Sequence, residues 1–275
     1  MSKIKDCLVK WEEKNQMKAS EAKVVKLMCQ VPPITKMDGK LNDLVSCEQL
    51  SLSTNMIDKI FPLPSLKKLR ILSLTRNNIK KISGLDELAE SLEELWLSYN
   101  QIEKLAGLNS LKKLRVLYIG NNRIKGADEL TKLQENPELA DLLCVGNPFY
   151  EGKAIEDRRV EVIRNLPGLK KLDGEMVKSE ERDRALVLRV VRLESVHRFD
   201  SEAPGDDFLD DPELNLIQRH RAVQSHHQEH GSPAFIAFDP KPIPFDQHLF
   251  QTSRAGGHET KYLQIVNLHC GYSLI

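Results

Sequence analysis

A pattern of leucines and asparagines that recurs along the chain constrains its fold more than any other feature. The spacing LxxLxLxxNxI/L fits five times, and its copies start at Cys47, Leu69, Leu92, Leu114 and Leu139. Successive starts are 22, 23, 22 and 25 residues apart, and a shortened sixth copy, LKKLDG, begins at Leu169. Because chance would not hold the asparagines in one register, the pattern predicts a repeat architecture.

Each position of the repeat has a physical role. In LxxLxL, alternate side chains point to opposite faces of a short strand, so the leucines enter a common core. The asparagine then turns the chain, and its amide can satisfy backbone groups that are unpaired at the bend. We therefore expect a buried ladder of stacked asparagines. Its members are Asn55, Asn77, Asn100, Asn122 and Asn147.

These features predict an α/β fold, a leucine-rich repeat solenoid of about six 22-residue repeats with a parallel sheet on its concave face. So short a repeat favours short helices or 3₁₀ turns on the opposite side. We expect an N-terminal helical cap at 1–43, the repeats with their C-terminal cap at 44–174 and a C-terminal helix at 175–199. Residues 200–275 show no sustained period and are expected to be disordered.

Both ends of the repeats show sequence patterns typical of caps. At the front, Ile4, Leu8 and Trp11 share one helical face, and a second short helix is expected from Ser20 to Pro32. At the rear, a helix is expected between Asn147 and Pro167. Its apolar side comprises Ile155, Val160, Val162, Ile163 and Leu166. The apolar positions of the helix at 175–199 are Met176, Ala185, Leu186, Leu188, Val191 and Leu193.

The composition excludes several classes of function. Lys plus Arg equals Asp plus Glu at 40 each, so no global field attracts nucleic acid or a membrane. No apolar run could span a bilayer, and the five cysteines show no CxxC spacing, which favours a reduced compartment with buried thiols. All eight histidines follow Val196, and no phosphate-binding loop, HExxH or GxSxG motif occurs. We expect no enzyme activity, metal or cofactor.

The outward-facing positions of the strands predict where a partner would bind. The first two repeats place mostly small polar residues there, whereas repeats three to five place large apolar ones. Exposed apolar patches mark interaction sites, and Trp and Tyr are common anchors. We also expect a glycine in the patch to allow close approach of a partner's backbone. The candidate partner-binding residues are Ile71, Trp96, Val116, Tyr118, Gly120, Leu143 and Val145.

Basic residues recur just before or within the strands, at Lys67, Lys68, Arg70, Lys112, Lys113, Arg115, Lys170 and Lys171. Two interpretations are open. The residues either form a positive edge for an acidic partner or a solvated rim that keeps the protein soluble, and the second is favoured because Lys is common on any surface.

Several segments outside the repeat consensus resemble the leucine-rich repeat light chains of outer-arm axonemal dynein. They are WEEKNQMKASEAKVVKLMCQVPPITKMD from Trp11, CEQLSLSTNMIDKI from Cys47, LEELWLSYNQIEKL from Leu92 and VGNPFYEGKA from Val145. The similarity covers about residues 4–178. Members of this family usually end near here, so the extension departs from the family pattern.

The resemblance implies a non-catalytic subunit that binds a dynein heavy chain through the sheet face and tunes how the motor engages the microtubule. It implies a location in the cytoplasm and cytoskeleton, in the axoneme of cilia or flagella, with tubulin as a further candidate partner. Two alternatives remain open at this stage. One is a targeting subunit of a protein phosphatase, which shares the 22-residue period, and the other is a splicing-type repeat protein.

Overall fold

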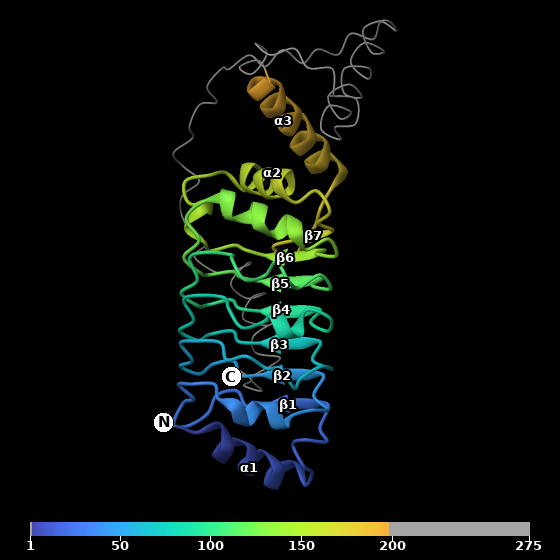
Figure 1. The fold of residues 1–275 in the computed structure, drawn as a ribbon. Coiled ribbons are helices and arrows are strands. Elements are labelled where there is room, and N and C mark those ends of the chain that lie inside the picture. The colour runs from blue at the N-terminus through green and yellow to red at the C-terminus, as the bar shows by residue number, and fades with distance from the viewer. Residues whose placement is uncertain (1, 198–275) are drawn as a thin grey trace, which may run out of the picture. The chain divides into compact units, whose positions relative to one another are not determined.

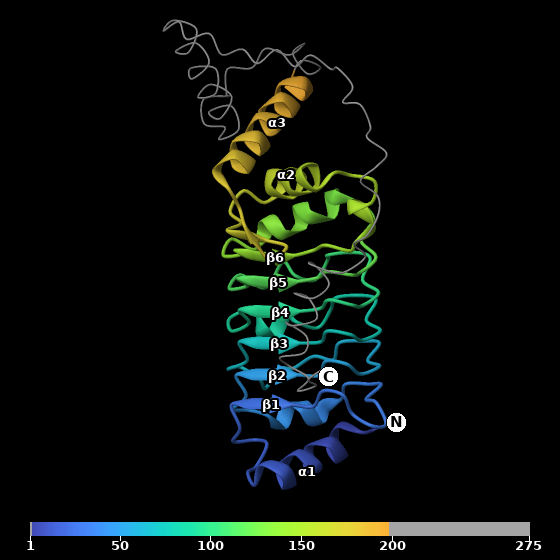
Figure 2. The same cartoon turned by 180° about the vertical axis from the view of Figure 1, so that it is seen from behind.

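The computed structural model describes residues 2–197. The chain divides into two units, Met1–Val191 and Arg192–Ile275. The first unit contains an eight-stranded sheet in which the strands follow one another in sequence order, β1 to β8. In Figure 1 the strands lie one above another, with α1 at one end of the stack and α2 at the other, and Figure 2 shows the same order from behind. The expected extension at 200–275 lies outside the described residues.

The six predicted strands are confirmed at the predicted positions. They are β2 (Gln49–Ser51), β3 (Ile71–Ser73), β4 (Glu94–Trp96), β5 (Val116–Tyr118), β6 (Asp141–Leu143) and β7 (Lys171–Leu172). Each pairs in parallel with the next, and the leucine at the same place in every repeat is fully buried, as Leu50, Leu95 and Leu142 illustrate. The repeat spacing therefore places one strand per coil on a common core.

The asparagine ladder is also confirmed. Asn100 is typical: its Nδ2 donates to the carbonyls of Leu97 at 2.9 Å and Leu74 at 3.0 Å, and its Oδ1 accepts from the backbone N–H of Ile79 at 2.9 Å. One amide thus satisfies backbone groups of its own coil and of the preceding coil. Asn55, Asn77, Asn122 and Asn147 make the same bonds in their repeats and are buried.

The front cap contains one helix and not two. α1 (Ile4–Asn15) buries Ile4 and Leu8 as predicted, with Trp11 packed against the core. The predicted second helix from Ser20 is wrong, because this segment forms strand β1 (Val24–Lys26), which pairs in parallel with β2.

The burial of β1 alternates, with Val25 buried between two exposed residues, which is the period of a strand. Ala22 and Gln30 stand where the later repeats have Leu and Asn, so this coil is a divergent repeat that the strict spacing did not detect. It extends the parallel sheet by one strand at the front.

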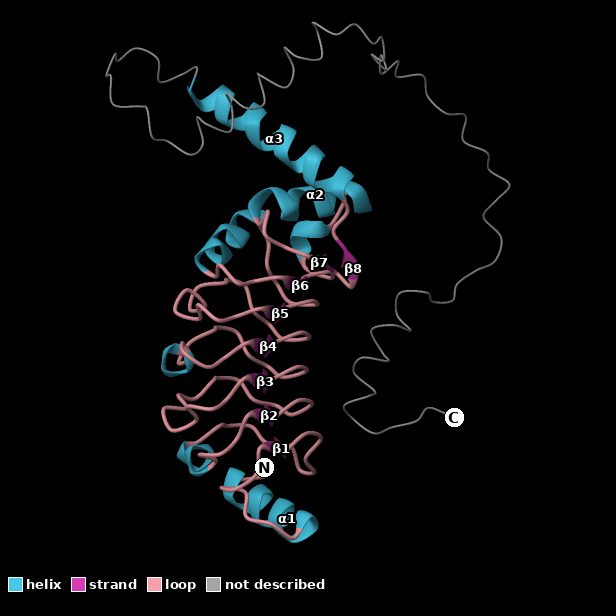
Figure 3. Ribbon diagram, turned by 90° about the vertical axis from the view of Figure 1, so that its right-hand side faces the viewer, coloured by secondary structure: helices cyan, strands magenta, loops and turns pink. Residues whose placement is uncertain are grey.

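The side of the coil opposite the sheet contains short 3₁₀ segments, as predicted (Figure 3). They are η1 (Gly39–Asp43), η2 (Asp86–Leu88) and η3 (Ala127–Glu135). A further 3₁₀ turn, η4 (Pro148–Tyr150), follows the last ladder asparagine. The larger spacing after Leu114 accommodates η3, which is longer than η1 and η2.

The rear cap is built by α2 (Ile155–Asn165), which confirms the predicted helix. Val160, Val162 and Ile163 are buried against the last repeats, as is Leu166 just after the helix. Ile155 was assigned to the same apolar side, and this is wrong, because it lies at the first position of the helix with 61% of its surface exposed.

The predicted helix at 175–199 begins later and buries less than expected. Residues Glu175–Met176 form β8, antiparallel to β7, and α3 spans Ser179–His197. Of its predicted apolar positions, Ala185 is buried, whereas Met176, Leu186 and Leu188 are exposed. Side chains from 190 onward, including Val191 and Leu193, lie outside the described residues. Antiparallel pairing with β7 explains the late start, because residues 175 and 176 are taken up by the sheet.

Candidate functional site

The side of the sheet that faces away from the leucine core, here called the strand face, brings most of the predicted binding residues together. The parallel register places Ser73 beside Trp96, Trp96 beside Tyr118, and Tyr118 beside Leu143. Trp96, Tyr118, Val116 and Val145 are half-buried, so each leaves part of its surface open. The repeat thus converts residues more than 20 positions apart in the chain into direct neighbours.

The two aromatic side chains stack on one another. The ring centroids of Trp96 and Tyr118 are 5.9 Å apart and the ring planes differ by 21°. Stacked rings on adjacent strands support each other sideways, so little side-chain freedom is left to lose when a partner covers them. This pair is the aromatic centre of the apolar surface on the strand face.

The hydroxyl of Tyr118 connects the stack to a polar group on the next strand. It donates to Asp141 Oδ2 at 3.3 Å, and the same carboxylate faces Lys171 Nζ at 3.3 Å. Burial, reinforced by the charge of Asp141, raises the pKa of Tyr118 well above its ordinary value. The phenol is therefore neutral at physiological pH and acts as a hydrogen-bond donor. The apolar surface of the patch ends at the ion pair between Asp141 and Lys171.

Two predicted residues have a different role from the one expected. Gly120 is buried, and a Cβ there would lie 3.1 Å from Leu143 Cδ2 and 3.1 Å from the carbonyl oxygen of Val145. The expectation that Gly120 leaves space for a partner is therefore wrong, because the side chain of Leu143 occupies that space. Leu143 itself is only 9% exposed, so its side chain packs beneath the patch and contributes little exposed surface.

Ile71 lies at the border of the patch and not within it. It pairs with Glu94, and Glu94 pairs with Val116, so a carboxylate separates the two apolar side chains along that row. Ile71 is half-buried. The continuous apolar surface therefore begins at Trp96.

The front of the strand face is closed by its own hydrogen bonds. The hydroxyls of Ser53 and Ser73 are 2.6 Å apart, and Ser51 Oγ donates to Ser53 Oγ at 3.3 Å. All three serines are at most 7% exposed. Small side chains bonded to one another offer a partner neither apolar area nor free polar groups.

Two residues beside the patch were missed by the sequence reasoning. Tyr99, in the turn after β4, is 38% exposed, and the guanidinium of Arg76 lies 5.2 Å from its ring centroid. Both occupy the position before a ladder asparagine and have positive φ angles, 56° for Arg76 and 58° for Tyr99. The aromatic residue at this turn position could have indicated the contact from the sequence, because stacked coils bring equivalent turn residues together.

The basic residues before the strands are mostly neutralised within the chain, which agrees with the favoured interpretation of a solvated rim. Arg70 donates twice to Glu93, each bond 2.8 Å long. Ion pairs also join Lys67 to Glu87, Lys113 to Glu90, Lys112 to Glu135 and Lys171 to Asp141. Each of these five side chains finds a carboxylate on a neighbouring coil, which the linear sequence does not reveal.

A buried polar cluster at the rear has a structural role. Asp173 accepts hydrogen bonds from the backbone N–H groups of Cys144 at 2.7 Å and Val145 at 2.9 Å, and from the hydroxyl of Tyr150 at 2.8 Å. Burial raises the pKa of Asp173, while these donors act in the opposite direction. The carboxylate binds the end of β6 to the rear cap, as the ladder amides do for earlier strands.

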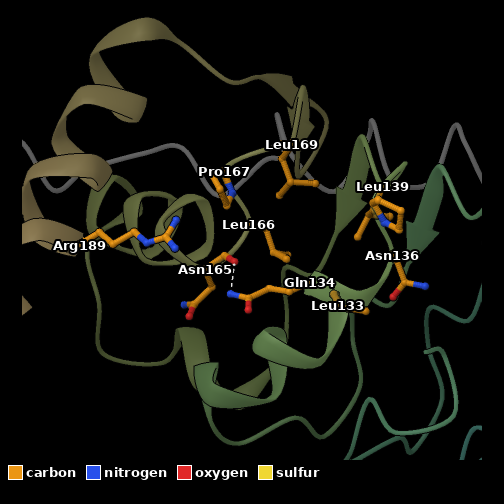
Figure 4. Close-up of a pocket in the computed structure, with 11 residues that line it drawn as sticks. Leu133, Gln134, Asn136, Leu139, Asn165, Leu166, Pro167, Leu169 and Arg189 are labelled. Atoms are coloured by element: carbon orange, nitrogen blue, oxygen red, sulfur yellow. Dashed lines mark hydrogen bonds between the residues drawn. The ribbon is translucent and has the colours of Figure 1, made fainter. Parts of the chain in front are cut away.

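A hollow of about 260 Å³ lies between η3, α2 and the turn that follows α2 (Figure 4). Its lining includes Leu133, Gln134, Leu166 and Arg189, and Gln134 Nε2 donates to the carbonyl of Asn165 at 2.9 Å. The lining comes from the ends of η3 and α2, the residues that follow them, and Arg189 of α3, and it brings no set of catalytic groups together. We therefore assign the candidate site to the strand face.

Two buried thiols in the described chain form hydrogen bonds, Cys47 Sγ with the carbonyl of Gln49 and Cys144 Sγ with the hydroxyl of Tyr150, both at 3.2 Å. Cys7, Cys47 and Cys144 are buried and free, and burial raises the pKa of Cys47 to about 11. Cys29 is half-buried, and Cys270 lies beyond the described residues. Within residues 2–197, no group of His, Cys, Asp or Glu side chains is arranged to hold a metal. None of the helices that the structure describes is both long and apolar enough to cross a bilayer.

Comparison with known proteins identifies relatives over most of the described chain. A family model for leucine-rich repeats in two copies matches residues 90–134. Dynein axonemal light chain 1 of Xenopus laevis is 58% identical over 182 residues, which covers 66% of this chain and 95% of that protein. The protein of the same name from Chlamydomonas reinhardtii is 50% identical over 190 residues, covering 68% of this chain and 96% of the relative.

Among solved structures, an internalin from Listeria monocytogenes is 23% identical with a TM-score of 0.39. The match covers 55% of this chain and 48% of the internalin chain. The relatives named above are light chains with leucine-rich repeats, which are interaction proteins and not enzymes. This confirms the expectation that the chain has no catalytic function. Because the matches cover more than nine-tenths of the length of each of these two relatives, the chain belongs to the dynein axonemal light chain 1 family.

Proposed function

We propose that this chain is a light chain of an axonemal dynein in cilia or flagella and that it holds the dynein heavy chain through the strand face. The family name supports the light-chain role and the axonemal location. The observation that carries the proposed binding mode is the stacked pair of Trp96 and Tyr118, which is half-buried on a face that the described chain leaves uncovered.

The physical argument concerns how the surface is prepared for a partner. The fully buried leucines and the ladder fix the backbone beneath the aromatic pair. Large side chains held by rigid strands lose little freedom on binding, and aromatic anchors of this kind supply a large share of interface free energy. A heavy-chain segment with an apolar side would cover Trp96, Tyr118 and Val116 and would meet the Asp141–Lys171 pair at its edge.

Binding of this kind gives a non-catalytic subunit a means of tuning the motor. A light chain that binds one heavy-chain conformation more tightly than another shifts the population toward the first. The proposal therefore includes an effect on how the motor engages the microtubule. Tubulin is a second partner to be tested in the same experiments.

The test is co-purification of axonemal dynein heavy chain with a double variant, Trp96→Ala with Tyr118→Ala. We expect binding to weaken by about 100-fold or more, since truncating each anchor costs roughly 2 kcal/mol. A matched control, Gln49→Ala with Thr75→Ala, changes two residues at the front of the same face and should bind normally. Circular dichroism and thermal unfolding verify that both variants fold.

Heavy-chain binding by the folded aromatic variant at wild-type strength would overturn the proposed binding face. Failure of the wild-type chain to retain any heavy chain, with a phosphatase recovered instead, would overturn the light-chain assignment itself. The two results separate the site from the function.

A further inference from the structure

The two rims of the strand face differ in how their charges are balanced. At the rim where the strands begin, basic side chains lie beside carboxylates of the next coil, as in Lys23 with Glu48 at 3.0 Å and Arg70 with Glu93 at 2.8 Å. The rim where the strands end is built from the stacked segments that follow β3, β4 and β5. These segments, here called the strand-end rim, are residues 76–81, 99–104 and 121–125.

Backbone hydrogen bonds hold the strand-end rim together. The N–H of Gln101 donates to the carbonyl of Ile79, and the N–H of Arg123 donates to that of Ile102, both at 2.8 Å. The asparagine ladder lies directly beneath these bonds. The backbone positions that carry equivalent side chains are therefore held in a fixed row along the edge of the strand face.

This row carries an excess of positive charge. It contains six basic residues and one acidic residue, Glu103. The basic residues are Arg76, Lys80, Lys81, Lys104, Arg123 and Lys125. In the part of the chain that the structure describes, none of the six forms an ion pair. The five lysines and arginines other than Arg76 are exposed.

Arg76 shows that the charge is also positioned. Its guanidinium lies over the ring of Tyr99, which restrains the side chain without cancelling its charge. Tyr99 follows β4, the strand that carries Trp96, so this cation lies at the end of the strand that bears one of the apolar anchors. A partner that covers the aromatic pair would therefore meet uncompensated positive charge on one side and mostly neutralised charge on the other.

We propose that the heavy-chain segment bound at the strand face is amphipathic, with apolar side chains over Trp96 and Tyr118 and a row of Asp or Glu side chains against the strand-end rim. This inference rests on the proposed function and adds the chemistry and orientation of the partner. Complementary charge of this kind accelerates association and fixes the register of a bound segment, while the apolar contacts supply most of the affinity. Nucleic acid is a weaker fit, because the chain has no net charge and the adjoining surface is apolar.

The experiment measures the affinity and association rate of axonemal dynein heavy chain at several salt concentrations. The test variant is Arg123→Glu with Lys125→Glu, which leaves the aromatic anchors and the Arg76–Tyr99 contact unchanged. The matched control is Lys68→Glu with Arg115→Glu, which reverses two exposed charges at the opposite rim that form no ion pair among the described residues. Thermal unfolding verifies that both variants are folded, and Arg123→Gln provides a milder second variant.

We expect the test variant to associate about tenfold more slowly at low salt and to lose most of the wild-type salt dependence, since rim charges act mainly on encounter. The control variant should change the association rate at low salt and its salt dependence by less than about threefold, and Arg123→Gln should give an intermediate effect.

Equal effects of the test and control variants would overturn the inference. So would an affinity that is independent of salt in the wild type. If the test variant instead loses binding to vesicles of anionic lipid while heavy-chain binding is unchanged, the rim serves a lipid surface and the inference fails. Any of these results, together with loss of binding by the Trp96 and Tyr118 variant, would leave the proposed function intact.

Discussion

The front and rear halves of the strand face are built on the same scaffold and present opposite surfaces. The front, on β2 and β3, carries mostly small hydroxyl side chains that bond to one another, as Ser53 and Ser73 do at 2.6 Å. The rear, on β4 to β6, carries the Trp96–Tyr118 stack and ends at the Asp141–Lys171 ion pair. The leucine core and the ladder continue unchanged beneath both.

The difference shows that the fold and the proposed binding surface are encoded in different positions of one repeat. Inward-facing residues are interchangeable between coils because they meet the same core, so they carry the architecture. Outward-facing residues meet no core and are free to differ. In this chain the serine hydroxyls at the front form hydrogen bonds with one another, whereas the rear positions leave apolar surface exposed.

The first prediction tests the scaffold that both halves share, and its effect should be the largest. Asn100→Ala removes an amide that bonds to Leu74, Leu97 and Ile79 and leaves buried backbone groups without partners. We expect the free energy of unfolding to fall by about 3 kcal/mol. Urea denaturation followed by circular dichroism measures this loss.

The control is Asn78→Ala, because Asn78 is a half-buried residue of the same type whose side chain makes one long bond, 3.4 Å, to Gln101. It should cost less than about 0.5 kcal/mol. Equal losses for the two variants would show that the ladder does not stabilise the coils as described.

The second prediction concerns the front half alone. Ser53→Ala breaks the bond to Ser73 and leaves buried hydroxyls unpaired, so we expect a loss of about 1 kcal/mol in the free energy of unfolding. Heavy-chain binding should not change, because the bonded serines offer a partner almost no open surface. A binding defect in the folded variant would show that the interface extends across the front, and the contrast between the halves would then fail.

The third prediction concerns the pH response of the rear half and is the smallest. Burial raises the pKa of Tyr118 above that of an unfolded tyrosine, which is about 10. The folded state therefore keeps its proton while the unfolded state loses one, so stability is unaffected below pH 10 and falls as the pH rises beyond it. Linkage gives at most about 1.4 kcal/mol per pH unit for one such group.

In Tyr118→Phe this contribution is absent. The variant should match the wild type at pH 8, within a few tenths of a kcal/mol, because the bond to Asp141 is long at 3.3 Å. Between pH 10 and 11 it should lose less stability than the wild type. Urea unfolding at these pH values provides the comparison, and parallel curves for the two proteins would contradict the prediction.

The sequence predicted the repeated architecture because its signal is local and periodic. One leucine pattern placed six strands correctly, and the asparagines of five copies placed the ladder. The apolar residues between Asn147 and Pro167 placed the rear helix. The same reasoning failed at β1, where Ala22 and Gln30 replace the consensus residues. A three-residue strand has too little local preference to be recognised, and its pairing with β2 decides its conformation.

The candidate site was predicted in its centre and not at its edges. Trp96 and Tyr118 could be placed because the register of parallel strands follows from the repeat. Tyr99 was missed because it reads as a loop residue, and the role of Gly120 was misjudged because the position of Leu143 is decided by packing. These contacts join residues 23 positions apart, a separation that no local pattern describes.

The sequence by itself determined the coil, the order of the strands and which side chains face the core, because the period of the leucines repeats the geometry of one turn. The tertiary structure alone decided which outward-facing groups remain available. Arg70 is neutralised by Glu93 of the next coil, whereas Arg123 finds no carboxylate among the described residues. Charge balance and exposure depend on distances between coils, and only the stacked structure sets those distances.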